Sequence, residues 1–128
     1  LNDNAPGWSQ IPLRGQISVT GGNQIRTGDE ITYTVYFLSD GATPAFGTNL
    51  CDQIPTGTGF LANTAEIQRN NIAPTAGGTL FSPLAPLPAG NACQNQTNPN
   101  GSVIFGLGDL PNTTDSNFGF VRFRVRIN

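Results

Sequence analysis

Residues 28–38 read Gly-Asp-Glu-Ile-Thr-Tyr-Thr-Val-Tyr-Phe-Leu, and this stretch decides the fold. After the Gly-Asp turn, apolar and polar side chains alternate along the chain. Ile31, Tyr33, Val35 and Phe37 fall on one face, and Glu30, Thr32, Thr34 and Tyr36 fall on the other. Because successive side chains of a strand point to opposite faces, the pattern predicts a half-buried β-strand. The β-branched and aromatic residues favour the same assignment.

Seven further segments have strand-like patterns, and no segment has a sustained helical period. They are residues 14–20, 48–54, 60–61, 65–67, 79–84, 102–107 and 118–127. The residues expected to face the core in the last two are Val103, Phe105, Leu107, Val121, Phe123, Val125 and Ile127. Residues 108–117 are expected to turn, and the proline-rich residues 69–99 are the least periodic. About seven to nine short strands with frequent turns predict an all-β fold, a two-sheet antiparallel sandwich with Greek-key connections.

Composition narrows the classes of function. The chain has 128 residues, enough for one domain, and a net charge of −2 with 11% charged residues. This balance provides no basic field for nucleic acid and no cationic face for anionic lipid. No apolar run approaches the roughly 18 residues that span a bilayer. Because residue 1 is Leu, we expect a processed form or a fragment, from which a signal peptide could have been removed.

The chain contains no His, Lys or Met, which excludes several catalytic chemistries. No His-dependent nucleophile, lysine Schiff base or P-loop can form, so we do not expect an enzyme. Two cysteines alone cannot complete a zinc site, and no cofactor is expected. The one ion left open is calcium, which needs six to eight oxygen ligands. Its candidate ligands are Asp29, Glu30, Asp40, Asp52, Asp109 and Asp115, which form no contiguous binding loop.

The two cysteines, Cys51 and Cys93, are interpreted as a structural disulfide. They lack the close spacing of redox or metal-binding pairs, which is the alternative. A bond between them would close a loop of about 43 residues and stabilise the fold by about 4 kcal/mol in the chain-entropy model. An oxidised pair implies a secreted protein.

Several of these motifs together resemble the prokaryotic cell-surface repeat family called domain of unknown function eleven. The first matching features are Gly28-Asp29 before the alternating strand that contains Tyr33, then Asp52-Gln53-Ile54-Pro55, then the Thr56-Gly57 turn before Phe60. The last is a series of three segments: a short apolar strand at residues 103–107, the Gly108-Asp109-Leu110 turn, and a long strand at residues 120–127. The resemblance covers about 100 residues, 14–127. The Ser39-Asp40-Gly41 turn, the disulfide and the proline-rich middle depart from the family pattern. The resemblance implies an immunoglobulin-like sandwich in an extracellular or cell-surface protein, with a structural or adhesive role and no shared catalytic residues.

Two surface features are candidates for contacts. Arg122, Arg124 and Arg126 form a row on the outward face of the last predicted strand. The row is either a docking stripe for an acidic partner, such as the next subunit, or a solvated face that discourages edge aggregation. Asn95, Asn100 and Asn112 each begin a sequence that fits the N-glycosylation pattern, which has meaning only in a host that glycosylates secreted proteins.

Residues 1–13 are expected to form an N-terminal arm ahead of a sandwich domain at residues 14–128. Trp8, Ile11 and Leu13 are its candidate anchors. The arm could fill a groove in a neighbouring copy, which is strand donation and gives a fibre because head-to-tail filling does not close. It could instead be a linker or the start of the first strand.

The sequence therefore predicts a structural subunit of an extracellular or cell-surface filament or surface layer. Its partners are copies of itself or the neighbouring domains of a surface protein. The alternative is a non-catalytic adhesin or spacer module that binds a carbohydrate or a protein.

Overall fold

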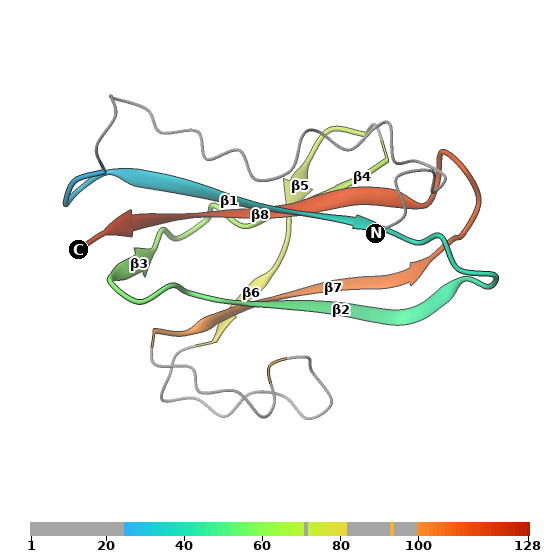
Figure 1. Ribbon diagram of the computed structural model, residues 1–128, viewed down its shortest axis with the longest axis horizontal. Helices are drawn as coiled ribbons and strands as arrows, with labels where there is room; N and C mark the ends of the chain where they lie inside the picture. Colours follow the sequence, from blue (N-terminus) through green and yellow to red (C-terminus); the bar gives the residue numbers. More distant parts are fainter. Residues whose placement is uncertain (1–24, 71, 82–92, 94–99) are drawn as a thin grey trace.

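The computed structural model describes residues 25–70, 72–81, 93 and 100–128, and these residues form eight β-strands and no helix. The strands are β1 (Glu30–Leu38), β2 (Ala45–Gln53), β3 (Thr58–Phe60), β4 (Glu66–Arg69), β5 (Thr75–Ala76), β6 (Thr79–Phe81), β7 (Ser102–Leu110) and β8 (Phe118–Ile127). All the strand pairs are antiparallel, and the strands form two sheets in two layers (Figure 1). The predicted all-β, two-sheet antiparallel fold is confirmed, and the Greek-key order stays a prediction.

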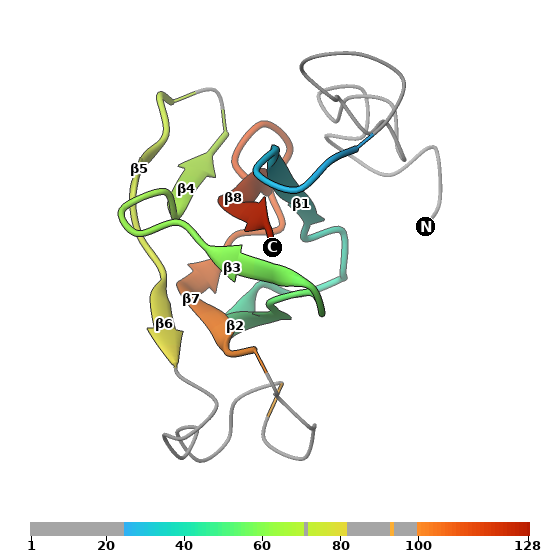
Figure 2. The same cartoon turned by 90° about the vertical axis from the view of Figure 1, so that its left-hand side faces the viewer.

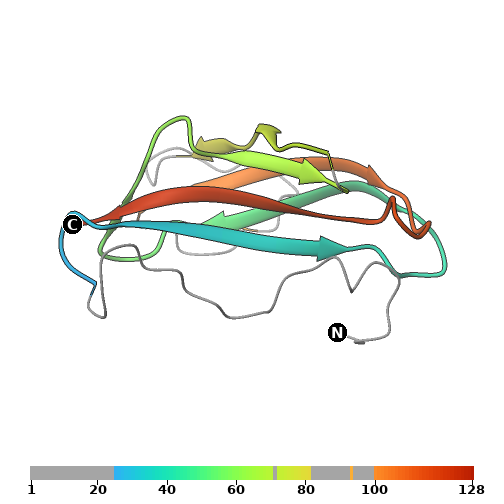
Figure 3. The same cartoon turned by 90° about the horizontal axis from the view of Figure 1, so that it is seen from above.

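The larger sheet has the order β1-β8-β4-β5, and β3 also pairs with β8. Because β1 pairs with β8 along its whole length, β3 and β4 share the other edge of β8 (Figure 3). The smaller sheet has the order β2-β7-β6. We call them sheet A and sheet B. The central strands, β8 and β7, therefore have neighbours on both edges.

The core lies between the two central strands. Val103, Phe105 and Leu107 of β7 face Val121, Phe123 and Val125 of β8, and none of the six side chains is more than 2% exposed. Phe123 stands at the centre, with its ring centroid 6.5 Å from Phe105 in the other sheet and 5.5 Å from Tyr33 on β1. Full burial of one such side chain contributes about 1.5–3 kcal/mol. The predicted inward faces of both strands are confirmed, except that Ile127 is only half-buried.

Two glycines allow the chain to cross from sheet A to sheet B. Gly77 and Gly78 separate β5 from β6, and Gly78 has a φ of +89°. A Cβ atom on Gly78 would lie 2.7 Å from the ring of Phe105, and one on Gly77 would lie 2.7 Å from Ile67. The backbone therefore passes directly against the core at this corner. The β4, β5 and β6 strands cover one side of the sandwich, which we call the closed side (Figure 2).

Several predicted boundaries differ from the structure: β2 begins at Ala45 rather than at residue 48, β3 begins at Thr58 rather than at residue 60, and β5 was not predicted. The end of β7 also differs. Residues 108–110 were expected in a turn, yet β7 continues to Leu110, which is 6% exposed and belongs to the core. The register of β2 against β7 shifts on both sides of Thr48, and Gly108 has a φ of +63°. These shifts are a β-bulge that accommodates Gly108 within β7, and the strands pair again beyond it, where Ala45 lies opposite Leu110. A glycine in a strand pattern was thus a bulge rather than a turn.

Candidate functional site

The side of the sandwich opposite the closed side is formed by two edge strands. Among the described strands, β1 has β8 as its one neighbour and β2 has β7 as its one neighbour. Both edges lie on the same side of the molecule, away from β5 and β6 (Figure 2). We call this the open side. An edge strand presents backbone groups that can pair with another strand.

The backbone of β1 shows which of its groups point outward. Ser39 N donates to Asn117 O at 2.7 Å, and Ile127 N donates to Asp29 O at 2.9 Å, one bond at each end of the β1–β8 ladder. With this register, the odd-numbered residues of β1 lie in its hydrogen-bonded pairs. The N–H and C=O groups of Thr32, Thr34 and Tyr36 are therefore directed to the outer edge.

The inward side chains of the two edge strands are less buried than the core they touch. They are Ile31, Tyr33, Val35, Phe37 and Leu50, which pack against the core cluster but stay partly exposed. By contrast, Val121, the direct register partner of Val35, is fully buried. The open side therefore presents an apolar stripe next to backbone groups that can accept a strand. This combination is the geometry that β-augmentation uses.

Asp52 interrupts this stripe on β2. It lies opposite Val103 in the register, so it shares the inward face of sheet B with a fully buried residue. Burial raises the pKa of the Asp52 carboxyl above its ordinary value, and a hydrogen bond from the Gln53 backbone opposes the shift. No ion pair between described residues includes Asp52. An inward-pointing charge on an edge strand disfavours unspecific pairing, so it would select among incoming strands.

Asp52 was not predicted to have this role, although its position in the strand pattern indicates the inward face. Leu50, Asp52 and Ile54 have the same parity, and Leu50 and Ile54 are apolar. Strand periodicity therefore places the carboxyl on the core-facing side. Asp52 was instead a candidate calcium ligand and part of the Asp52-Gln53-Ile54-Pro55 motif.

The predicted arginine row lies on the outer face of sheet A, and its charges are paired. Arg126 Nη2 is 2.8 Å and Arg124 Nη1 is 3.2 Å from the two carboxylate oxygens of Glu30. Arg122 Nε donates to Glu66 Oε2 at 2.5 Å. The hydrogen bond from Arg126 is the main cause that lowers the pKa of Glu30, and burial opposes it. Three arginines against two glutamates leave a face with one excess positive charge.

A shallow depression of about 260 Å³ opens on the same face. Its lining residues are Thr32, Asn63, Thr64, Glu66, Arg122 and Arg124. Beside it, the rings of Tyr36 and Phe120 meet edge to face at 5.7 Å, and the Arg122 guanidinium lies 5.4 Å from the Phe120 ring centroid. Hydroxyl, amide and charged groups next to exposed rings form a polar surface that could hydrogen-bond a ligand.

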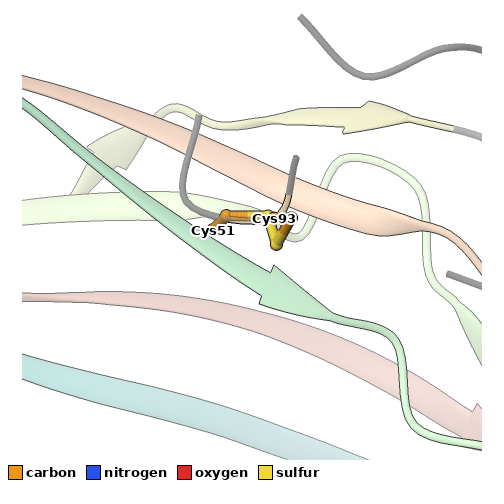
Figure 4. Close-up of a disulfide and its surroundings, with 2 residues drawn as sticks. All are labelled: Cys51 and Cys93. Atoms are coloured by element: carbon orange, nitrogen blue, oxygen red, sulfur yellow. A yellow bond between two sulfur atoms is a disulfide. The ribbon is translucent and has the colours of Figure 1, made fainter. Parts of the chain in front are cut away.

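Cys51 and Cys93 form a disulfide, as Figure 4 shows, with their Cα atoms 5.8 Å apart. In the register, Cys51 lies opposite Ile104, so it occupies the outer face of sheet B rather than the core face. Cys93 is 1% exposed. The bond therefore ties β2, one of the two open-side strands, to a residue 42 positions later in the chain.

The remaining predicted site residues are only partly covered by the structure. Trp8, Ile11, Leu13 and Asn95 lie outside the described residues, as do the predicted strand at residues 14–20 and most of the proline-rich middle. Asn100 Nδ2 donates to Pro55 O and Asn112 Nδ2 donates to Gly41 O, both at 3.0 Å. Each of these two amides thus has a hydrogen bond within the fold.

The acidic residues considered for calcium are dispersed. Asp29 Oδ2 accepts from Arg26 N at 2.8 Å, and Asp109 Oδ1 accepts from Gly47 N at 2.9 Å. Asp115 has a φ of +68°, which is typical of a turn. Within the described residues, no three acidic, histidine or cysteine side chains gather into a group that could hold a metal ion.

Comparisons with known proteins give no match: no family model, no curated protein and no solved structure is similar to this chain. In the part of the chain that the structure describes, no helix is long and apolar enough to cross a membrane.

Proposed function

We propose that this chain is a non-catalytic structural subunit of an extracellular or cell-surface assembly, and that it joins its neighbours through the open side. The observation that carries the proposal is the pair of edge strands, β1 and β2, on one side of the sandwich. Between them lies the partly exposed apolar stripe of Ile31, Tyr33, Val35, Phe37 and Leu50. An extended segment from a neighbouring copy would add backbone hydrogen bonds to an edge and bury the stripe.

The N-terminal residues 1–13 are the proposed donor. A segment donated to the next copy makes a head-to-tail contact, which does not close and therefore produces a fibre. The disulfide supports an oxidising compartment outside the cytoplasm. The resemblance to a cell-surface repeat family favours the same location.

Negative-stain electron microscopy of the natively purified chain tests the proposal. Long fibres of uniform width are expected, and a variant without residues 1–13 should give only isolated particles. Fibres that persist without these residues would exclude them as the donor. Isolated particles from the intact chain, at all concentrations, would contradict a polymerising subunit.

An edge variant locates the contact on β1. Thr34→Pro removes an outward N–H and leaves the hydrogen-bonded pairs with β8 intact, because Thr34 is even-numbered in the register. It should abolish fibres while the far-ultraviolet spectrum stays that of the parent. The control is Thr113→Pro in the loop before β8, which lies outside the β1–β8 register and should leave the fibres unchanged.

The outer face of sheet A favours a second candidate, a surface module that binds a carbohydrate. The polar depression beside Tyr36 and Phe120 is the observation that supports it. A glycan array with the monomeric chain tests this candidate. Binding that Arg124→Gln reduces at least tenfold would support it, and an array without any concentration-dependent signal would reject it.

A further inference from the structure

A second pocket lies at the end of the sandwich where β1, β4 and β7 finish and β8 begins. Its volume is about 310 Å³. Its lining combines apolar side chains, Phe37 of β1, Leu110 of β7 and Phe118 of β8, with about as much polar surface, to which Arg69, Asn70 and Ser116 contribute. Ligand sites are typically concave and mostly apolar, with a few polar groups that fix orientation.

Arg69 is the one charged residue in the lining of this pocket. Its side chain is half-buried, and its Nη2 donates to Leu107 O of the opposite sheet. The ion pairs among the described residues involve Arg122, Arg124 and Arg126, so none of them neutralises Arg69. A guanidinium has five N–H donors, and one bond to a carbonyl oxygen leaves most of them free for an anion. A half-buried cation without a carboxylate gains free energy when an anion binds beside it.

The rim of the pocket is held in place by hydrogen bonds. Asn70 N donates to Phe118 O at 2.8 Å. In the amide orientation that satisfies its neighbours, the Asn70 side chain donates to Phe118 O and Ser116 O, each at 3.2 Å. Asn117 Nδ2 donates to Ser39 O at 3.0 Å, which joins the two loops at this end. The pocket is therefore formed before any ligand arrives, and binding needs little ordering of the chain.

We propose that this end pocket binds a carboxylate carried on an apolar body, with Arg69 beside the carboxylate and Phe37 and Phe118 against the body. Planar guanidinium groups match carboxylates through two parallel hydrogen bonds. One cation balances one carboxylate, whereas a phosphate carries more charge and is not suited to apolar walls. The proposal does not require strand donation, because six of the seven residues that line the pocket lie outside the open-side stripe and only Phe37 is shared with it.

A titration with 3-phenylpropionate, followed by ¹H–¹⁵N correlation spectra of the ¹⁵N-labelled full chain in its monomeric state, tests the site. Saturable shifts are expected at the amides of Asn70, Ser116 and Phe118. The neutral isostere, 3-phenylpropionamide, should bind about tenfold more weakly, because a hydrogen bond to a charged group contributes roughly 1.5–3 kcal/mol. Equal binding of the acid and the amide, or no saturable shifts, would overturn the proposal.

Two variants distinguish a specific contribution of Arg69 from the effect of losing any one positive charge. Arg69→Gln should weaken binding of the acid by the same tenfold and leave binding of the amide unchanged. Arg26→Gln, which removes an exposed guanidinium ahead of β1, should change neither. Inorganic phosphate that competes at the same amides as strongly as 3-phenylpropionate would show a general anion site and would overturn the proposal. If Arg69→Gln does not fold, the comparison of acid and amide on the parent chain still decides the question.

Discussion

The closed side and the open side of this sandwich differ in how their edge strands are arranged. On the closed side, β5 and β6 follow each other in the chain and pass from sheet A to sheet B through Gly77 and Gly78. On the open side, β1 and β2 also follow each other, and each is an edge of its sheet among the described strands, as β5 and β6 are. The difference is length: β1 and β2 have nine residues each, whereas β5 and β6 have two and three. Among the described residues, the closed side therefore offers only short edges beside a tightly packed backbone corner, and the open side offers two long edges.

The difference has an energetic and a functional consequence. Close backbone packing at the closed side leaves no space for change, since a Cβ atom on Gly78 would overlap the ring of Phe105. The partly exposed stripe of the open side leaves apolar surface for another strand to bury. A subunit that accepts a strand from its neighbour needs a long sheet edge with free backbone groups and partly exposed apolar side chains, and the open side provides both. The predictions below test this comparison, from the largest expected effect to the smallest.

The disulfide is the one covalent tie of an open-side strand, and its loss should have the largest effect. The double variant Cys51→Ala/Cys93→Ala should lower the free energy of unfolding by about 4 kcal/mol, because the closed loop no longer restricts the unfolded chain. Urea denaturation of both proteins measures this difference. Hydrogen exchange should also become faster in β2 than in β8. Uniformly faster exchange in both strands would show that the disulfide does not act on the open side in particular.

The two sides should respond differently to an added methyl group at a glycine with positive φ. Gly78→Ala should cost about 3 kcal/mol, which combines the left-handed backbone with a clash against Phe105. Gly47→Ala on β2, at a φ of +58° with no atom within 4 Å of the new Cβ, should cost about 1 kcal/mol. Chemical denaturation measures both values. Equal losses would mean that packing at the closed-side corner is not the difference.

Two valines that face each other in sheet A compare the open-side edge strand with the central strand. Val35 on β1 lies directly opposite Val121 on β8, and only Val121 is fully buried. Val121→Ala should cost about 2.5 kcal/mol and Val35→Ala about 1 kcal/mol, because less apolar area leaves water at the partly exposed site. Thermal and urea denaturation of the isolated monomer report these losses. If fibres form, Val35→Ala should lose more stability in the fibre than in the monomer.

Strand periodicity was sufficient to predict most of this fold. The alternation of residues 30–38 and 118–127 identified β1 and β8 as strands and gave their inward faces, because one buried wall imposes a period of two, but it did not show that the two strands pair. The corner at Gly77 and Gly78 and the bulge at Gly108 were not predicted as such. Glycine marks a position where the backbone needs freedom, but tertiary packing decides whether the result is a turn, a corner or a bulge.

The candidate sites were less accessible to sequence reasoning. The outward arginines of β8 were predicted, but their partners Glu30 and Glu66 lie 96 and 56 positions away from Arg126 and Arg122. Only the register brings these residues together. Arg69 was overlooked for the same reason, since its pocket is assembled from the ends of four strands. Which edge strands are left without a described neighbour is also a property of the whole sheet rather than of any segment.

The smallest expected effects come from two carboxyl groups, Asp52 and Glu30. They discriminate well between the open side and the outer face of sheet A, because folding shifts their pKa values in opposite directions. Burial raises the pKa of Asp52 at the open side above its ordinary 3.8. The folded state therefore takes up this proton at a higher pH than the unfolded chain, and the carboxylate destabilises the fold at neutral pH. The hydrogen bond from Arg126 lowers the pKa of Glu30 on sheet A below its ordinary 4.5. That carboxylate stabilises the fold above the unfolded value, and its contribution is lost as the pH falls through the folded value.

Asp52→Asn should therefore raise the urea midpoint at pH 7, and the gain should vanish once the pH is below the ordinary pKa of an aspartate. Glu30→Gln should lower the midpoint at pH 7 by a small amount, because its ion pairs are solvent-exposed, and should have no effect at pH 2. Parallel urea titrations from pH 2 to pH 7 measure both differences. A decrease in the midpoint of Asp52→Asn at pH 7 would mean that the open-side carboxylate is held by a favourable contact. In that case the inward face of β2 would already be satisfied, and strand addition at the open side would have to occur at the β1 edge.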